Sequence, residues 1–175
     1  LAECPENRHS CALAEIERVE SRREELGSAA GALTEYKVDL AVFERIRQKY
    51  ADNKEGAVQI ALREAELMNQ IGQKMQALAQ YQYILRTYPE FTSACAEARY
   101  KSGRLYAAIG QSDAAQNSYL QTITLYPNQL RWRLAAIHQL MAVAYETSDP
   151  TRQMSRFSEL AFQYQQVPII NSLAR

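Results

Sequence analysis

A period of 38 residues runs through most of this chain and constrains its fold more than any other feature. Tyr88-Pro89 recurs 38 residues later as Tyr126-Pro127, and Ile71-Gly72 recurs at the same interval as Ile109-Gly110. Two aromatic columns follow this spacing: Phe43, Tyr81, Tyr119 and Phe157, and then Tyr50, Tyr88, Tyr126 and Tyr164. A fixed period of this size is typical of a repeat array, in which each unit buries its apolar face against its neighbours.

The apolar spacing within each period is that of α-helices. Ala61, Ala65 and Met68, for example, lie four and three residues apart, which places them on one face of a helix. Gly72 and Gly110 are expected in the turns between helices, as left-handed residues that end the first helix of each pair. No alternating apolar stretch between turn residues indicates a strand. We therefore predict an all-α fold, a right-handed α-solenoid of about four helical hairpins.

The predicted array occupies residues 12–165, between a leader at 1–11 and a C-terminal cap at 166–175. Its first helices are expected at about 12–33, 55–71, 91–109 and 129–147, and its second helices at about 36–50, 74–88, 112–126 and 151–165. Pro89 and Pro127 are expected where a new helix begins, because the first turn tolerates a missing amide. Asp113, with Ser112 as an alternative, is expected to cap the helix that follows Gly110.

The two central periods resemble the tetratricopeptide repeat (TPR) family. The matching pattern is a small residue, an aromatic residue four positions later and a proline eight positions beyond that: Ala77, Tyr81 and Pro89, and again Ala115, Tyr119 and Pro127. Gly103 occupies the small site at which adjacent helices of the family approach closely. The usual TPR period is about 34 residues. The longer period ending in Tyr-Pro resembles the exported bacterial branch of the family, with its BamD-like and CpoB-like proteins.

The resemblance implies a non-enzymatic scaffold for protein–protein interactions, which binds a partner segment in a concave groove as part of a bacterial cell-envelope assembly. A second hypothesis is an accessory repeat domain of a cell-envelope enzyme or glycan-export system whose catalytic part lies outside this chain. A third is self-association through the open faces of the array.

In TPR proteins the first helices line the groove, and the resemblance assigns that face here. Arg63 and Lys101 are one period apart, and Arg104 lies one helical turn beyond Lys101. We expect these cations to form a strip that holds an acidic or C-terminal peptide segment through charge-assisted hydrogen bonds. The expected partner-binding residues are Arg63, Asn69, Tyr100, Lys101, Arg104, His138 and Tyr145. A plain solvated face is the alternative interpretation of the same residues.

Trp132, flanked by Arg131 and Arg133, allows two interpretations. An exposed tryptophan beside arginines has the composition of a protein-binding hot spot. The alternative is an anchor packed between the third and fourth repeats.

Neither catalysis nor a cofactor or metal is indicated by motif. The two histidines, His9 and His138, have no serine, cysteine or carboxylate partner at motif spacing. The sequence has no Gly-rich phosphate loop, no H-E-x-x-H and no C-x-x-C.

Charge and hydropathy also limit the partners. Lys and Arg number 20 and so do Asp and Glu, which falls short of the basic excess expected of a nucleic-acid binder. No stretch approaches the 18 or so consecutive apolar residues that a transmembrane helix needs.

Three cysteines bear on the compartment. Cys4 and Cys11 lie close together in the leader, where either a disulfide or two thiols fit the sequence. A disulfide would indicate an oxidising compartment such as the periplasm, so we expect the periplasm or cell envelope, with the cytoplasm as the alternative. Cys95 lies alone on a predicted helix and is expected to be a small packing residue.

Overall fold

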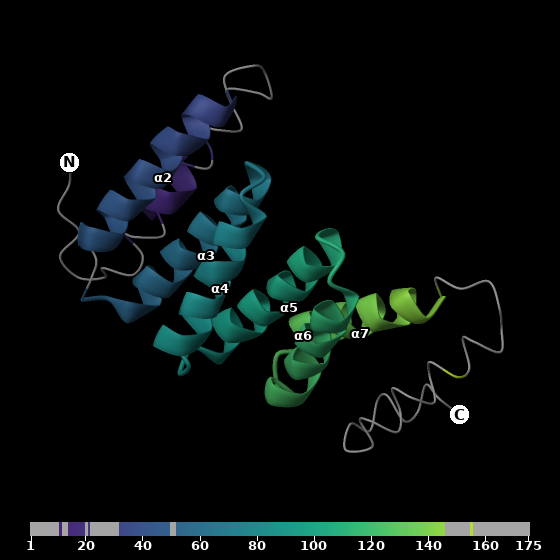
Figure 1. Ribbon diagram of the computed structural model, residues 1–175. Coiled ribbons are helices and arrows are strands. Elements are labelled where there is room, and N and C mark those ends of the chain that lie inside the picture. The colour runs from purple at the N-terminus through teal and green to yellow at the C-terminus, as the bar shows by residue number, and fades with distance from the viewer. Residues whose placement is uncertain are drawn as a thin grey trace. The chain divides into compact units, whose positions relative to one another are not determined.

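The computed structural model describes residues 11, 14–19, 21, 32–49, 52–145 and 155, and every regular element in this part of the chain is an α-helix (Figure 1). The helices are α2 (Ala32–Lys49), α3 (Lys54–Gln70), α4 (Lys74–Thr87), α5 (Thr92–Ala108), α6 (Ser112–Leu125) and α7 (Leu130–Tyr145). Residues 14–19 are also helical. The predicted all-α fold is confirmed, and α2 with α3, α3 with α4, and α6 with α7 pack as neighbours, as in an α-solenoid of TPR-like hairpins.

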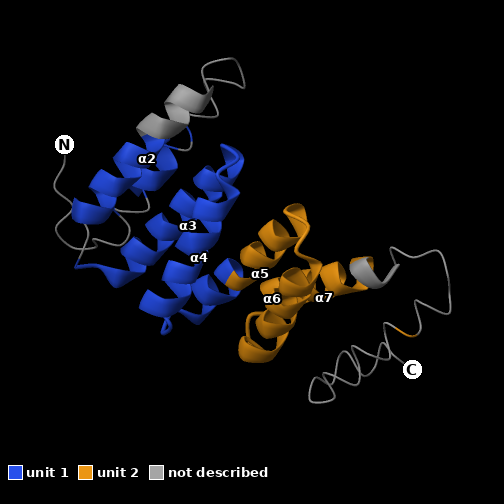
Figure 2. Cartoon of the chain, viewed as in Figure 1, with its two compact units in different colours: residues 1–98 blue, residues 99–175 orange. Residues whose placement is uncertain are grey.

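The chain divides into two compact units, residues 1–98 and 99–175 (Figure 2). Unit 1 contains α2, α3, α4 and the beginning of α5. Unit 2 contains the remainder of α5, together with α6 and α7. The predicted second helix at 151–165 and the predicted cap at 166–175 lie outside the described residues, apart from Ser155.

The helices from α3 to α7 begin and end within one or two residues of the predicted limits. The boundary near the start of α2 is different, because we expected one helix to end at residue 33 and the next to begin at residue 36. Ala32 and Leu33 instead open α2. Both are strong helix formers, and no proline or glycine separates them from Tyr36, so the helix extends toward the N-terminus.

The glycine turns repeat with the period. Gly72 has φ +82° and Gly110 has φ +79°, in the left-handed region that glycine adopts at little cost. At the first turn, Gln73 N donates to Met68 O at 2.8 Å and Gly72 N donates to Asn69 O at 3.0 Å. The turn at Gly110 has the same two bonds at 2.9 and 3.0 Å. These are the two bonds of a Schellman motif, and they confirm the prediction that a left-handed glycine ends the first helix at Gly72 and at Gly110.

The prolines are not at the helix starts, so that prediction is wrong. Pro89 lies in a turn three residues before α5 begins at Thr92, and Pro127 lies three residues before α7 begins at Leu130. Each turn is closed by a bond to the carbonyl of the tyrosine before the proline: Phe91 N to Tyr88 O at 3.1 Å, and Gln129 N to Tyr126 O at 3.0 Å. The proline ends the preceding helix, and the chain uses two further residues to reverse.

The predicted cap of α6 is also wrong. The helix begins at Ser112, so Ser112 and Asp113 are helical, and the N-cap is Gln111, whose side chain makes no capping hydrogen bond. Gln73 has the same place before α4. The Schellman turn sets this register because it leads directly into the next helix, and Asp113 remains favourable in the first turn through the helix dipole.

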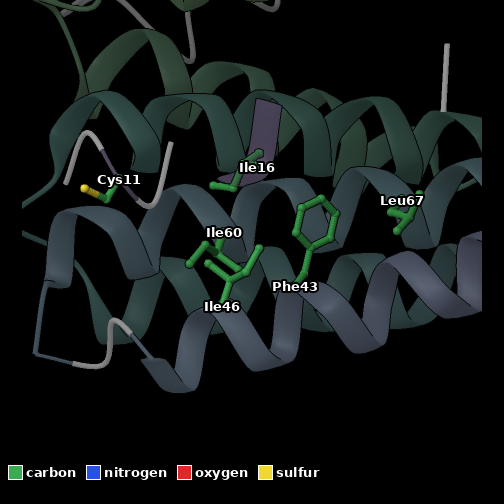
Figure 3. Packing of buried hydrophobic residues seen from close by; sticks show 6 residues of the cluster. All are labelled: Cys11, Ile16, Phe43, Ile46, Ile60 and Leu67. Carbon is green, nitrogen blue, oxygen red and sulfur yellow. The ribbon is translucent and has the colours of Figure 1, made fainter. Parts of the chain in front are cut away.

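The first aromatic column, which begins at Phe43, supplies large buried side chains to the cores of both units. Phe43, Tyr81 and Tyr119 are each at most 2% exposed, and Tyr81 and Tyr119 are both the eighth residue of their helices. The burial predicted from the period is therefore confirmed for these three residues, while Phe157 lies outside the described residues. In unit 1, Phe43 packs in an apolar cluster with Cys11, Ile16, Ile46, Ile60 and Leu67 (Figure 3). Burying such a side chain contributes about 1.5–3 kcal/mol.

The second column continues this packing at the helix ends. Tyr88 is buried, with ring centroids 5.9 Å from Tyr83 and 6.4 Å from Phe91, and Tyr126 is half-buried. Cys95 is buried too, and its Sγ donates to Tyr88 O at 3.2 Å. The expectation that Cys95 is a small packing residue is confirmed. Tyr50 and Tyr164 lie outside the described residues.

Candidate functional site

Three aromatic rings from three helices meet in unit 2. Tyr100 of α5 has its ring centroid 5.9 Å from that of Tyr119 on α6 and 5.6 Å from that of Trp132 on α7. We call these three residues the aromatic cluster, and all three are buried. Burial, with a smaller contribution from neighbouring Tyr100, raises the pKa of Tyr119 from 10.0 to about 12.

Gly103 makes this packing possible. A Cβ atom at residue 103 would lie 2.6 Å from Cε1 of Tyr119 and 2.8 Å from Cδ1, closer than nonbonded carbon atoms approach. The absence of a side chain lets the Tyr119 ring lie directly against the α5 backbone. This is the close approach that the family resemblance implied for Gly103.

Two cations lie over the ring of Trp132. Nζ of Lys101 is 5.7 Å from a Trp132 ring centroid, and Cζ of Arg131 is 4.6 Å from one, both within the range of cation–π attraction. Trp132 is 9% exposed, so of its two interpretations the packed anchor fits the structure. Arg104 is exposed. It lies close enough to Tyr119 for its positive charge to oppose part of the rise in the pKa of Tyr119. We call Lys101, Arg104 and Arg131 the cationic cluster.

The remaining predicted partner-binding residues do not all lie where the groove prediction placed them. Tyr100 does not face an open groove, because the residue is 8% exposed and its ring packs inside the aromatic cluster. His138 is exposed on α7. Tyr145 is the last residue of α7, and its side chain lies outside the described part of the structure. Cys4, and with it the predicted Cys4–Cys11 disulfide, also lies outside the described residues, as does His9.

Arg63 and Asn69 are both exposed on α3 in unit 1. Nη1 of Arg63 contacts Oε2 of Glu66 at 3.0 Å, three residues along the same helix. Arg63 and Lys101 belong to different units, so their stacking into one strip stays a prediction.

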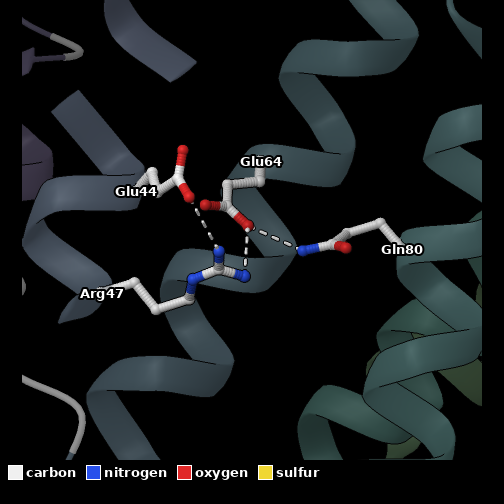
Figure 4. A network of polar contacts seen from close by, with 4 residues as sticks. All are labelled: Glu44, Arg47, Glu64 and Gln80. Carbon is white, nitrogen blue, oxygen red and sulfur yellow. Dashed lines mark hydrogen bonds and ion pairs between the residues drawn. The ribbon is translucent and has the colours of Figure 1, made fainter. Parts of the chain in front are cut away.

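A second polar site in unit 1 was not predicted. A pocket of about 330 Å³ lies among α2, α3 and α4, lined by Leu40, Ala41, Glu44, Arg47, Glu64, Met68 and Gln80. We call it the Glu64 pocket. Figure 4 shows its polar residues, with the carboxylates of Glu44 and Glu64 above the two terminal nitrogens of Arg47.

Glu64 is the buried member of this network. Its side chain is 6% exposed, and Oε2 lies 3.6 Å from Nη1 of Arg47. The same oxygen accepts a hydrogen bond from Nε2 of Gln80 at 2.7 Å. Glu44 is 3.8 Å from Nη2 of Arg47. Burial raises the pKa of Glu64 above its usual value of 4.5, Arg47 opposes this effect, and Glu44 adds to it.

The 38-residue period contains a signal for the burial of both Glu64 and Tyr100. The residue one period after Glu64 is Ser102, and the residue one period before Tyr100 is Leu62. Ser102 and Leu62 are both buried. A small or apolar residue at the equivalent position of the neighbouring repeat therefore indicated that Glu64 and Tyr100 face inward. The residues one period after Arg47 and Gln80 are Leu85 and Ser118, so the same signal is present for them, but it does not show that both side chains meet Glu64.

The described side chains show no group of three or more His, Cys, Asp or Glu residues that could hold a metal ion. No helix in the described part of the chain is long and apolar enough to span a membrane.

The geometry of unit 2 agrees with a comparison to known families. Residues 97–128 match the tetratricopeptide repeat family. The matched segment contains Gly103, Ala115, Tyr119 and Pro127, which are among the residues that carried the resemblance. No curated protein matches the chain significantly. The match supports a TPR protein, and the exported bacterial branch stays a prediction.

Proposed function

We propose that this chain is a non-enzymatic scaffold that binds an acidic segment of a partner protein at the cationic cluster of unit 2. The TPR match favours a protein–protein interaction scaffold as the general function. The observation that supports this particular site is the placement of Lys101 and Arg131 over the Trp132 ring. A cation held against a buried ring loses less conformational freedom when it binds a carboxylate, so more of the interaction energy appears as affinity.

The proposal changes the predicted groove in two respects. Tyr100 acts from beneath, by supporting Trp132, and Arg131 joins Lys101 and Arg104 as a contact residue. Arg63, Asn69 and His138 are exposed and remain proposed contacts for the rest of the partner segment, with Tyr145 beside them on sequence grounds. We place the scaffold in a bacterial cell-envelope assembly, because of its long repeats ending in Tyr-Pro.

The test begins with a pulldown from cell-envelope extract, followed by mass spectrometry and measurement of the affinity of each candidate partner. The double variant Lys101→Glu/Arg104→Glu should bind the partner about tenfold more weakly or worse, because it replaces charge-assisted contacts with repulsion. The loss should shrink as salt rises, since exposed charges are screened.

A matched control carries the same change in net charge elsewhere. Arg45→Glu/Arg86→Glu alters two exposed arginines of unit 1 and should leave the affinity within about twofold of wild type, as expected for charges outside the contact. Circular dichroism should show the same helix content in all three proteins. Wild-type affinity in the Lys101→Glu/Arg104→Glu variant would refute the proposed site.

A further inference from the structure

The Glu64 pocket is lined by two acidic residues and one basic residue. Glu44 and Glu64 are its acidic residues, and Arg47 is its basic one. The guanidinium of Arg47 already contacts both carboxylates, at 3.8 and 3.6 Å. An anionic ligand would have to compete with them for Arg47, whereas a cation would reduce the repulsion between the two acids.

The two polar contacts described for Glu64 are both made by one oxygen of its carboxylate. Glu64 lies on α3. Its ion pair with Arg47 and its hydrogen bond from Gln80 both use Oε2. Figure 4 shows Oε1 turned away from Gln80, on the side of Glu44. A carboxylate held in place by two partners on one oxygen can accept a charge-assisted hydrogen bond on the other.

The remaining wall of the pocket is apolar. Leu40 and Ala41 of α2 and Met68 of α3 line it beside the acids. Its volume of about 330 Å³ is at the small end of the range for ligand pockets. An apolar wall next to two carboxylates suits a ligand with an alkyl stem and a cationic head, as in the side chains of arginine and lysine.

We propose that the Glu64 pocket binds an arginine or lysine side chain of a partner protein. The alkyl stem lies against Leu40, Ala41 and Met68, and the cationic head lies against Oε1 of Glu64, on the side of Glu44 that Arg47 does not occupy. The choice of a protein side chain rests on the proposed function of the chain as a protein-binding scaffold, and a volume of about 330 Å³ suits a small group of this kind. This site lies in unit 1, so it is independent of the cationic cluster.

Nuclear magnetic resonance titration of the isotope-labelled chain tests the proposal with four probes. N-acetyl-arginine amide and N-acetyl-lysine amide carry the proposed group on a peptide backbone. N-acetyl-citrulline amide has the shape of the arginine probe without its charge. Butylguanidine has the head and stem without the backbone. We expect saturable shifts of the amides around the pocket with the arginine probe, weaker ones with the lysine probe, and none with citrulline.

Variants locate the site. Glu44 has a side chain that is 60% exposed, so Glu44→Gln should preserve the fold and weaken the arginine probe about fivefold, as the loss of a charge-assisted contact implies. Glu55→Gln, which removes an exposed carboxylate from the first turn of α3, should bind like wild type. Equal binding by Glu44→Gln and wild type, or equal shifts with arginine and citrulline, would overturn the proposal. Tighter binding of butylguanidine than of the arginine probe would also overturn it, since the pocket would then select a free small cation.

Discussion

Glu64 is the residue at which burial and charge oppose each other most directly in this chain. Its pKa is raised above 4.5 because burial penalises the carboxylate more than Arg47 stabilises it. The folded state therefore binds the Glu64 proton more tightly than the unfolded state does. The resulting contribution to stability is fully present below the unfolded pKa and is lost as the pH rises through the folded pKa.

Glu64→Gln should accordingly stabilise the protein at neutral pH. A glutamine can still accept the hydrogen bond from Gln80, and it carries no charge to desolvate. Below about pH 4.5 the variant and the wild type should have similar free energies of unfolding, and the variant should become the more stable protein as the pH rises. Urea unfolding at a series of pH values measures this difference. Greater stability of the wild type at neutral pH would show that the pair with Arg47 outweighs desolvation.

Gly103 should resist substitution although it lies inside a helix. Gly103→Ala would normally gain about 1 kcal/mol in helix propensity. Here the added Cβ would lie 2.6 Å from Cε1 of Tyr119, and that ring is buried and cannot move away freely. We expect a net loss of about 1–3 kcal/mol, as for other overpacked sites, measured by urea unfolding.

A position in the same helix provides the comparison for Gly103. Ala107 is exposed in the last turn of α5, so Ala107→Gly reports propensity without a steric clash, a loss of at most the ~1 kcal/mol of a helix interior. If Gly103→Ala instead gained stability by that amount, the close approach of α5 and Tyr119 would not constrain this residue.

At the scale of elements, the glycine turns give a matched pair of tests. A Cβ at Gly72 or Gly110 would meet no atom within 4 Å, so only the positive φ opposes a side chain there. Gly72→Ala and Gly110→Ala should each cost about 1–2 kcal/mol, the penalty for the left-handed conformation. Asparagine should cost less than alanine at both positions, because it tolerates that conformation better. Equal costs for alanine and asparagine would contradict this account.

The sequence predicted the elements well where they depend on local chemistry. The 38-residue recurrence of Ile-Gly located both Schellman turns, because a left-handed residue after an apolar helix is a local requirement. Pro89 and Ser112 were misplaced, since the number of residues needed to reverse the chain depends on turn bonds that propensity does not contain. Phe91 N to Tyr88 O is one such bond.

The site was less predictable than the fold for a physical reason. Lys101 and Arg104 remain predicted contacts, chosen because charges at helical spacing share one face of a helix. Tyr100 was taken for a groove residue, because its burial depends on Trp132 of another helix. Glu64 was missed as a buried carboxylate for the same reason, since its partners come from α2 and α4.

At the scale of the whole molecule, the prediction to test is that one acidic partner segment contacts residues of both units. Arg63 is an exposed cation of unit 1. Lys101, one period later, is a half-buried cation of unit 2. If one acidic segment contacts both, Arg63→Glu alone should weaken its binding about fivefold, as does the loss of a charge-assisted contact. The measurement is the affinity of the partner for Arg63→Glu, Lys101→Glu and the double variant at low salt. Unchanged affinity in Arg63→Glu would confine the binding surface to unit 2.

The buried position of Cys95 allows transient opening of the native chain to be measured from the alkylation rate of this cysteine. Cys95 is 1% exposed, and its thiol donates a hydrogen bond to Tyr88 O. An alkylating reagent can therefore reach it only when the segment around the Tyr88-Pro89 turn separates. We expect Cys95 to be alkylated slowly in native buffer and at a rate that rises steeply with denaturant. Peptide mapping by mass spectrometry distinguishes it from the other two cysteines. Under conditions where reclosing is faster than alkylation, the ratio of this rate to that of an unfolded peptide gives the free energy of opening without a spectroscopic label.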